Sequence, residues 1–197
     1  MWIVKLGGSL GRDPLLRAWL DELATIGSGR VVIVPGGGGF ADEVRDQQAH
    51  WRFDDLTAHN MAVLAMVQFG LMLQGLNPAL LPAAHEDEIR QALRQARVPL
   101  WLPFEALREQ PDPLTHWGVT SDSLAAWLCN RLNGERLVLV KSCPIAPGWS
   151  IDDCAARGIV DEQFGAFTRA QPYPVELLSR DELPRMRELL LAPVLVR

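Results

Sequence analysis

The segment RVVIVPGGGGF, residues 30 to 40, decides the fold class that the sequence predicts. Its first part, Arg30 to Val34, is β-branched and apolar on both faces, which is typical of a strand in a parallel sheet that helices cover. Pro35 and four consecutive glycines come next, and a helical pattern begins near Phe40. A buried strand, a sharp glycine loop and a helix therefore follow one another, as they do in α/β proteins.

Strands and helices alternate in the same way along the rest of the chain. We expect strands at residues 2–6, 30–34, 80–81, 98–102, 136–141, 175–178 and 194–196. We expect helices at residues 13–26, 40–51, 55–76, 86–95, 103–108, 123–132, 151–156, 161–170 and 180–191. Asp13 is predicted to cap the first helix, and Ser121 with Asp122 the helix at residues 123–132. This order predicts a three-layer αβα sandwich with a mainly parallel central sheet, in a single domain of residues 1–197.

The composition limits the kinds of partner that we expect. The chain has 197 residues, of which 48% are hydrophobic and 22% charged, as in soluble globular proteins. Its net charge of −5 argues against nucleic acid, because proteins hold phosphate backbones with basic patches. A few amides and lysines still suffice to bind one small phosphate compound. We therefore expect a small-molecule partner and no nucleic acid partner.

The sequence shows no pattern typical of secretion or of membrane insertion. It opens on an apolar strand pattern without a basic segment or a cleavage site, so we expect no signal peptide. The longest apolar helical stretch, residues 61–76, is interrupted by polar residues and glycine, and is predicted to be too short for a membrane span. Cys129, Cys143 and Cys154 show no CxxC spacing, which favours reduced thiols. We expect a cytoplasmic protein without a membrane partner.

Three of the predicted strands end in residues that suit the binding of phosphate. Ligands of open α/β sheets lie beyond the carboxyl ends of the strands. Glycine amides after a strand can form an anion-binding nest, and a following helix adds free N–H donors and a favourable dipole. Neither glycine stretch is a Walker A loop or a dinucleotide fingerprint. The three strand ends are Lys5-Leu6-Gly7-Gly8-Ser9, Pro35 followed by Gly36, Gly37, Gly38 and Gly39, and Lys141-Ser142.

Lys5, Lys141 and Asp122 are the candidate catalytic residues. Phosphoryl transfer depends on positioning and on positive charge near the moving group, and the two lysines would supply that charge. Two ammonium groups repel each other by about 4 kcal/mol at a separation of about 4 Å and an effective dielectric constant of about 20. A carboxylate between them offsets this repulsion. Asp122 lies at a predicted helix start after a loop, so it could reach the same crevice.

Four segments together make the sequence resemble the amino acid kinase family. They are VKLGGSL (Val4 to Leu10), VIVPGGGGFAD (Val32 to Asp42), TSDSLAAWL (Thr120 to Leu128) and LVLVKS (Leu137 to Ser142). The resemblance implies an ATP-dependent kinase in which Lys5 holds the β- and γ-phosphates, Lys141 is a second cation and Asp122 orients both lysines. It also implies Mg²⁺ held mainly by the phosphates of ATP, with no metal ligand from the protein. Finally, it implies nucleotide contacts from Gly7, Gly8, Ser9 and Ser142, and acceptor contacts from Gly36, Gly37, Gly38, Gly39 and Ser121.

Further features are the short length, the glycine loop that runs into FADEVR, the helix around HNMAVLAM (His59 to Met66) and the GIVDEQF stretch (Gly158 to Phe164). With them the chain is most similar to a compact subgroup of this family that is associated with methanofuran biosynthesis. In that subgroup an aminomethylfuran-methyl phosphate is phosphorylated to its diphosphate, which implies a phosphomonoester acceptor. The usual Thr-Asp-x-x-Gly stretch for nucleotide recognition is absent after Lys141, so residues of the adenine site are not assigned. The long helix rich in Met and Ala suggests a homo-oligomer, with His59 in packing or at a subunit interface.

Other functions remain open on these residues. Within the kinases, the acceptor could instead be a carboxylate, a carbamate or a nucleotide. A non-catalytic protein that binds a nucleotide or an oxyanion could use the same fold, and in a scaffold the glycine loops would be turns only. The presence of Lys5, Asp122 and Lys141 together favours an enzyme, because a protein that only binds has no need for this set of charges.

Overall fold

The described part of the protein is built on one six-stranded parallel sheet. The computed structural model describes residues 1–107 and 114–192. Within them the strand order is β3-β4-β2-β1-β5-β6, and every pair of neighbours is parallel. The strands are β1 (Trp2–Leu6), β2 (Val31–Pro35), β3 (Leu80–Ala83), β4 (Val98–Trp101), β5 (Arg136–Lys141) and β6 (Val175–Ser179).

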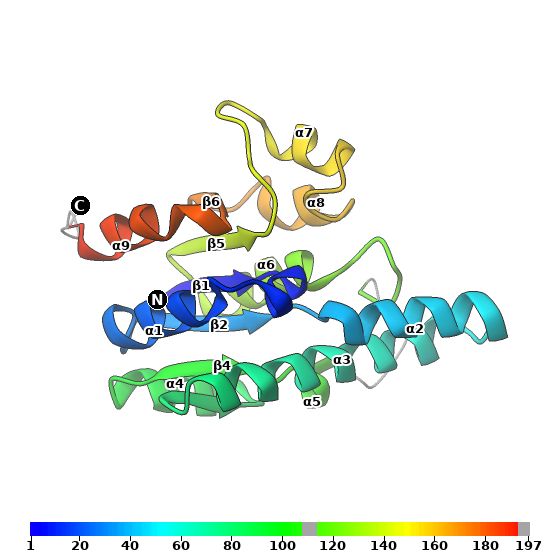
Figure 1. Ribbon diagram of the computed structural model, residues 1–197, viewed down its shortest axis with the longest axis horizontal. Helices are drawn as coiled ribbons and strands as arrows, with labels where there is room; N and C mark the ends of the chain where they lie inside the picture. Colours follow the sequence, from blue (N-terminus) through cyan, green and yellow to red (C-terminus); the bar gives the residue numbers. More distant parts are fainter. Residues whose placement is uncertain (108–113, 193–197) are drawn as a thin grey trace.

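Helices connect these strands and cover both faces of the sheet (Figure 1). Two short 3-10 turns, at Gly8–Arg12 and Arg180–Glu182, precede helices α1 and α9. The described helices are α1 (Leu16–Ile26), α2 (Gly38–Trp51), α3 (Asp55–Leu76), α4 (Glu86–Arg94), α5 (Phe104–Leu107), α6 (Ser121–Leu132), α7 (Ile151–Ala156), α8 (Phe164–Thr168) and α9 (Leu183–Leu191).

Two hydrophobic cores lie on opposite faces of the sheet, because successive residues of a strand point to opposite sides. On β1, Ile3 belongs to the core under α4, α6 and α8, whereas Val4 and Leu6 belong to the core under α1 and α9. Helix α3 contributes to both cores, and it runs beside α2 beyond the end of the sheet (Figure 1). The predicted three-layer αβα sandwich with a parallel central sheet is confirmed.

Two predicted helix caps are wrong. Helix α1 begins at Leu16, not at residue 13, because the chain first forms the 3-10 turn. The Asp13 carboxylate instead accepts a hydrogen bond from the Leu15 N–H at 2.9 Å. Helix α6 already begins at Ser121, and its cap is Thr120 rather than Ser121 or Asp122. The shift matters because Asp122 lies within the first turn of α6, where its side chain is free to serve another purpose.

Helix α3 is longer than the prediction about membrane spans assumed. It has 22 residues and is long and apolar enough to cross a membrane by length and composition, so the prediction that this stretch is too short is wrong. Core helices pass the same test, and 39% of its most apolar window is buried against the rest of the protein. The strand predicted at residues 194–196 lies outside the described residues.

Candidate active site

Two lysines and one carboxylate form a buried cluster at the carboxyl ends of β1 and β5. Lys5 Nζ lies 2.7 Å from Asp122 Oδ1, and Lys141 Nζ lies 2.5 Å from Asp122 Oδ2. The second contact is a hydrogen bond, whereas the first is an ion pair without an aligned hydrogen bond. Lys5, Asp122 and Lys141 are 4%, 3% and 9% exposed. One carboxylate therefore binds two ammonium groups away from bulk water.

The order and register of the strands bring the two lysines together. Lys5 on β1 is paired with Leu139 on the neighbouring strand β5. Residues two apart on a strand face the same side, so Lys141 shares the face of Leu139 and therefore of Lys5. Helix α6 covers this face, since its buried residues pack with Ile3 and Leu139. Asp122, the second residue of α6, thus reaches both lysines from the covering helix.

The charges of the cluster shift one another's protonation. Burial alone would raise the pKa of the Asp122 carboxyl, but attraction to Lys5 and then to Lys141 holds it below its ordinary value. Burial and then repulsion from Lys5 lower the pKa of Lys141 from 10.5 to about 8, against the attraction of Asp122 and Asp161. The carboxylate is therefore ionised at neutral pH, and Lys141 keeps its charge there but loses it under mildly alkaline conditions.

The two glycine loops beside this cluster lie so close together that only glycine fits where they touch. A Cβ atom on Gly8 would lie 2.0 Å from the Gly38 nitrogen, and one on Gly36 would lie 2.3 Å from the Gly8 nitrogen. Gly38 also has a φ of 58°, in the left-handed region that favours glycine. At Gly39, by contrast, a Cβ atom would meet nothing within 4 Å. Loop packing therefore requires three of these glycines, and Gly39 leaves open space toward solvent.

Gly7 and Gly36 do not line the crevice, contrary to the ligand contacts predicted for them. The Gly7 N–H donates to the Val140 carbonyl at 3.0 Å, and the Gly36 N–H donates to the Leu6 carbonyl at 2.9 Å. Both glycines are buried. Their amides extend the pairing of β1 with β5 and with β2, so these N–H groups are already occupied within the sheet.

An open crevice of about 690 Å³ lies over the lysine cluster. The N-cap of α2, Gly37, carries no side chain, so the first N–H groups of this helix have no capping partner there and are available to an anion. A polyphosphate in the crevice would meet these amides and the two ammonium groups. The predicted site residues that line it are Lys5, Gly8, Ser9, Gly37, Gly38, Gly39, Ser121, Asp122 and Lys141.

Asp161 belongs to this site, although no role was predicted for it from the sequence. Its Oδ2 accepts hydrogen bonds from the Thr120 N–H at 2.9 Å, the Thr120 hydroxyl at 2.8 Å and the Ser123 N–H at 3.0 Å. Its Oδ1 accepts from the Ser123 hydroxyl at 2.5 Å. Asp161 thus fixes the first turn of α6 from both sides of Asp122. A separate loop supplies this carboxylate, and although the GIVDEQF stretch contains it, nothing in that stretch pointed to hydrogen bonds with α6.

Ser142 lines a groove that adjoins the crevice beside Lys141. The groove is also lined by Trp149 and Arg157, and the Arg157 guanidinium carbon lies 4.5 Å from the centre of the Trp149 ring. An indole wall next to a phosphate site suits the stacking of a flat base. The sequence did not point to Trp149, because aromatic residues in loops carry no motif.

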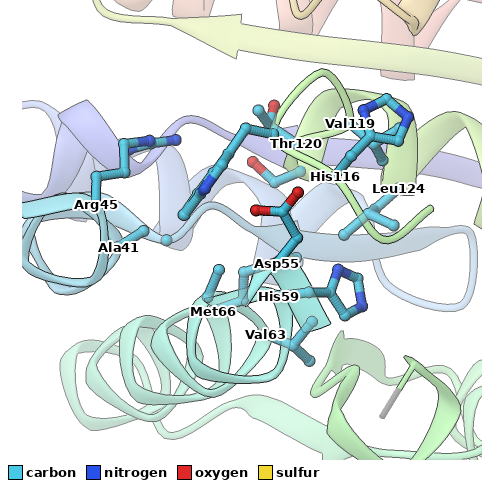
Figure 2. A pocket seen from close by; sticks show the side chains of 14 residues that line it. Ala41, Arg45, Asp55, His59, Val63, Met66, His116, Val119, Thr120 and Leu124 are labelled. Carbon is cyan, nitrogen blue, oxygen red and sulfur yellow. The ribbon is translucent and has the colours of Figure 1, made fainter. Parts of the chain in front are cut away.

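His59 lies in the wall of a second, smaller cavity, which shares Gly37 of the second glycine loop with the crevice (Figure 2). It is half-buried, and its Nε2 is 3.1 Å from the Leu107 carbonyl oxygen. A carbonyl only accepts, so Nε2 carries the proton in this contact. The expectation of a packing role for His59 therefore omits that the residue also faces a cavity.

Known proteins that are similar to this chain are kinases. The chain is similar to the [5-(aminomethyl)furan-3-yl]methyl phosphate kinase of Methanocaldococcus jannaschii, with 28% identity over 143 residues. The match spans 71% of this chain and 64% of the length of that kinase.

Two solved structures are similar to this chain over almost their whole length. The uridylate kinase of Archaeoglobus fulgidus has a TM-score of 0.67 at 14% identity, over 96% of this chain and 95% of that chain. An isopentenyl phosphate kinase has a TM-score of 0.63 at 15% identity, over 97% of this chain and 96% of that chain. At such identities the likeness concerns the fold.

The sequence model of the amino acid kinase family matches residues 1–144. This region contains both glycine loops and all three charged residues of the cluster. Because it also makes up well over half of the chain, the protein belongs to the amino acid kinase family.

Proposed function

We propose that this protein is an ATP-dependent kinase whose acceptor is the phosphomonoester [5-(aminomethyl)furan-3-yl]methyl phosphate, a step in methanofuran biosynthesis. The observation that carries the proposal is the buried cluster of Lys5, Asp122 and Lys141 under the crevice. Transfer of a phosphoryl group requires cations aimed at the moving group, whereas binding alone does not require two lysines held by one carboxylate. Similarity to the Methanocaldococcus jannaschii kinase supports the acceptor.

The chemical step needs no base from the protein. An oxygen of the acceptor phosphate attacks the γ-phosphorus of ATP, and a new P–O bond forms while the bond from the γ-phosphorus to the β–γ bridging oxygen breaks. The bridging oxygen leaves with the electron pair as part of ADP, and the acceptor becomes a diphosphate. A phosphomonoester has a second pKa of about 6, so its oxygens are already anionic at neutral pH. This fits a site whose carboxylates Asp122 and Asp161 are engaged in holding lysines and a helix turn.

The two lysines would act on different parts of the transferring group. Lys5, beside the first glycine loop, would hold the β- and γ-phosphates, and Lys141 would offset the charge that develops on the bridging oxygen. The N–H groups at the start of α2 would hold the moving phosphoryl group and the acceptor phosphate near Gly38 and Gly39. The groove beside Ser142 and Trp149 would take the adenosine part of ATP.

Magnesium fits this site as an ion that comes with ATP. Among the described residues no group of three or more His, Cys, Asp or Glu side chains could hold a metal ion. Mg²⁺ commonly keeps several waters and binds through phosphates with few protein ligands. Its contribution would be to neutralise the β- and γ-phosphate oxygens, while Lys5 and Lys141 align them.

The proposal is tested by incubating the protein with Mg-ATP and the synthetic furan phosphate. We expect release of ADP in a coupled assay and a diphosphate product in the phosphorus NMR spectrum. UMP, isopentenyl phosphate, a carboxylate and a carbamate are the competing acceptors. Lys5→Ala should lower kcat by about 10²- to 10³-fold, whereas Arg187→Ala, an exposed change on α9, should leave it unchanged. Absence of ADP release with the furan phosphate, or full turnover by Lys5→Ala, would contradict the proposal.

We also propose that the protein acts in the cytoplasm, where ATP is available, and that it forms a homo-oligomer. Exposed apolar side chains on α2 and α3 support assembly: Phe40, Leu64 and Leu71 are 42%, 41% and 50% exposed. Surfaces of this kind commonly mark interfaces between proteins. Light scattering on the wild type and on Leu64→Lys measures the mass directly, and we expect the variant to dissociate.

A further inference from the structure

The smaller cavity beside the crevice offers a site for the acceptor of the proposed reaction. It has a volume of about 60 Å³ and lies between the second glycine loop, the first turns of α3 and the segment that leads into α6 (Figure 2). Gly37, Arg45 and Thr120 line both this cavity and the crevice, so the two are continuous. A molecule in the smaller cavity would therefore extend toward the glycine loop over which the phosphoryl group moves.

The walls of the cavity are mostly apolar. They come from α2, α3 and α6, so the transfer of a flat, uncharged ring from water to this cavity has a favourable free energy. Drug-sized ligands usually occupy pockets of roughly 300–1,000 Å³. The space of about 60 Å³ is far smaller and suits one small ring better than a base together with its ribose. The apolar lining residues are Ala41, Ala62, Val63, Met66, Val119 and Leu124.

Asp55 brings a negative charge to this apolar space. It is the first residue of α3, and its carboxylate points into the cavity, between Arg45 and His116 (Figure 2). Oδ1 accepts a hydrogen bond from Gln48 Nε2 at 2.9 Å. The side chain is exposed and has no ion pair with another described residue, so a cationic group of a ligand can reach it.

Gln48 holds Asp55 in place. Its side-chain amide donates to Asp55, and its amide oxygen accepts from Trp117 Nε1 at 2.5 Å. The Arg45 guanidinium carbon in turn lies 4.7 Å from the centre of the Trp117 ring. The carboxylate and the guanidinium are thus fixed to one framework, with the guanidinium where the cavity joins the crevice. The cavity thus has a guanidinium, which also pairs with Asp42 at 2.8 Å, where it joins the crevice, and an exposed carboxylate in its wall.

We propose that Asp55 determines acceptor specificity by binding an ammonium group on a small, flat acceptor whose phosphate lies toward Arg45 and the lysine cluster. The inference rests on the proposed kinase function and adds the residue that selects the substrate. A primary alkylamine has a pKa near 10, as lysine does, so the aminomethyl arm is protonated at neutral pH. A hydrogen bond to a charged group is worth about 1.5–3 kcal/mol, which corresponds to a factor of about 10 to 100.

The test compares two acceptors that differ only at the arm. One carries the aminomethyl group, and the other carries a methyl group in its place. We expect the wild type to favour the amine by about 10- to 100-fold in kcat/KM, mainly through KM. Asp55→Asn should lose this preference while its kcat/KM for the methyl analogue stays within about twofold of the wild-type value.

Asp54→Asn is the matched control. Asp54 is the neighbouring residue, and its carboxylate accepts from the Thr57 N–H at 2.8 Å and the Thr57 hydroxyl at 2.9 Å, as the cap of α3. It does not line the cavity, and asparagine caps helices as well as aspartate does. The control removes the same charge from the same helix end, so it should keep the wild-type preference for the amine.

Binding measured by calorimetry without ATP separates this inference from the kinase proposal. If the wild type turns over neither acceptor but binds the amine more tightly than the methyl analogue, and Asp55→Asn binds both alike, the role of Asp55 stands and the kinase function fails. If the wild type phosphorylates or binds both acceptors equally well, or if Asp55→Asn keeps the preference, the role of Asp55 is refuted whatever the activity.

Discussion

Replacing Asp122 by asparagine should expose how the charge cluster stabilises the protein. The change keeps the size of the side chain and removes the one negative charge between two buried lysines. At 2.7 Å and an effective dielectric constant of about 20, each lysine attracts the carboxylate by about 6 kcal/mol, and desolvation cancels much of this. Breaking a buried ion pair usually costs about 3–5 kcal/mol, because the remaining charge is left uncompensated. For a chain of this size, that corresponds to a fall in Tm of roughly 6–20 °C.

The loss of stability in Asp122→Asn should depend on pH in a way that identifies Lys141. Without Asp122 the pKa of Lys141 falls further below its wild-type value of about 8, because a carboxylate that raised it is gone. Between the pKa of Lys141 in the folded protein and 10.5, the unfolded chain binds more protons than the folded chain, so stability rises with pH. In the variant this range starts at a lower pH than in the wild type, so the stability of the variant begins to rise at a lower pH. The difference in unfolding free energy from the wild type should therefore be larger at about pH 6 than at about pH 9.

Urea denaturation at several pH values, without nucleotide, measures both effects. Asp152→Asn is the matched control, because Asp152 also pairs with an arginine but is 77% exposed on its side chain. Exposed pairs contribute about 0–1 kcal/mol, so this variant should resemble the wild type at every pH. Asp122→Asn should also lower kcat by about 10²- to 10³-fold. The reasoning is refuted if Asp122→Asn costs no more than Asp152→Asn, or if its cost does not shrink as the pH rises.

Three further predictions concern the same site. Lys141 loses its proton as the pH rises through about 8, so kcat/KM of the wild type should fall on the alkaline side. Lys141→Arg, whose guanidinium stays charged, should lack this fall. An equal alkaline fall of kcat/KM in both proteins would contradict the assignment to Lys141. Gly8→Ala should destabilise the protein and abolish activity, since its Cβ would lie 2.0 Å from the Gly38 nitrogen. Gly39→Ala has open space and should unfold at the wild-type temperature or higher, which thermal unfolding of both variants would check. Asp161→Ala should lose several hydrogen bonds to a charged group, each worth about 1.5–3 kcal/mol. The variant should lower kcat more than it raises KM for ATP, because the change displaces the helix turn that carries the catalytic carboxylate Asp122. A variant with normal stability and kcat would show that this carboxylate does not position the turn.

Local sequence patterns were sufficient where a structure depends on neighbouring residues. The long stretch rich in Ala, Leu and Met predicted the bounds of α3, Asp55–Leu76, as the structure has them. The glycines after β1 and β2 gave the two loops, because few other residues allow such close turns. The structural reason for these glycines differs in part from the predicted one. Gly8 and Gly36 are needed for contact between the loops, and the Gly36 N–H donates a hydrogen bond within the sheet instead of to a ligand.

Patterns failed where partners come from distant parts of the chain. Thr120 replaced the predicted caps of α6, because Asp161 binds both its N–H and its hydroxyl and so fixes the helix start. Asp55 and Gln48 have nothing distinctive in sequence, and only the packing of α2 against α3 brings Gln48 to Asp55 in the cavity wall.

The sequence by itself determined the alternation of strands and helices, the glycine loops and the residue types from which a phosphate site can be built. Tertiary structure alone decided that Lys5 and Lys141 meet, because this depends on β5 rather than another strand lying next to β1. Strand order follows from how the whole set of apolar faces is buried at once, so it is a property of the complete fold. The alternation of side chains along each strand then places both lysines under the helix that carries Asp122.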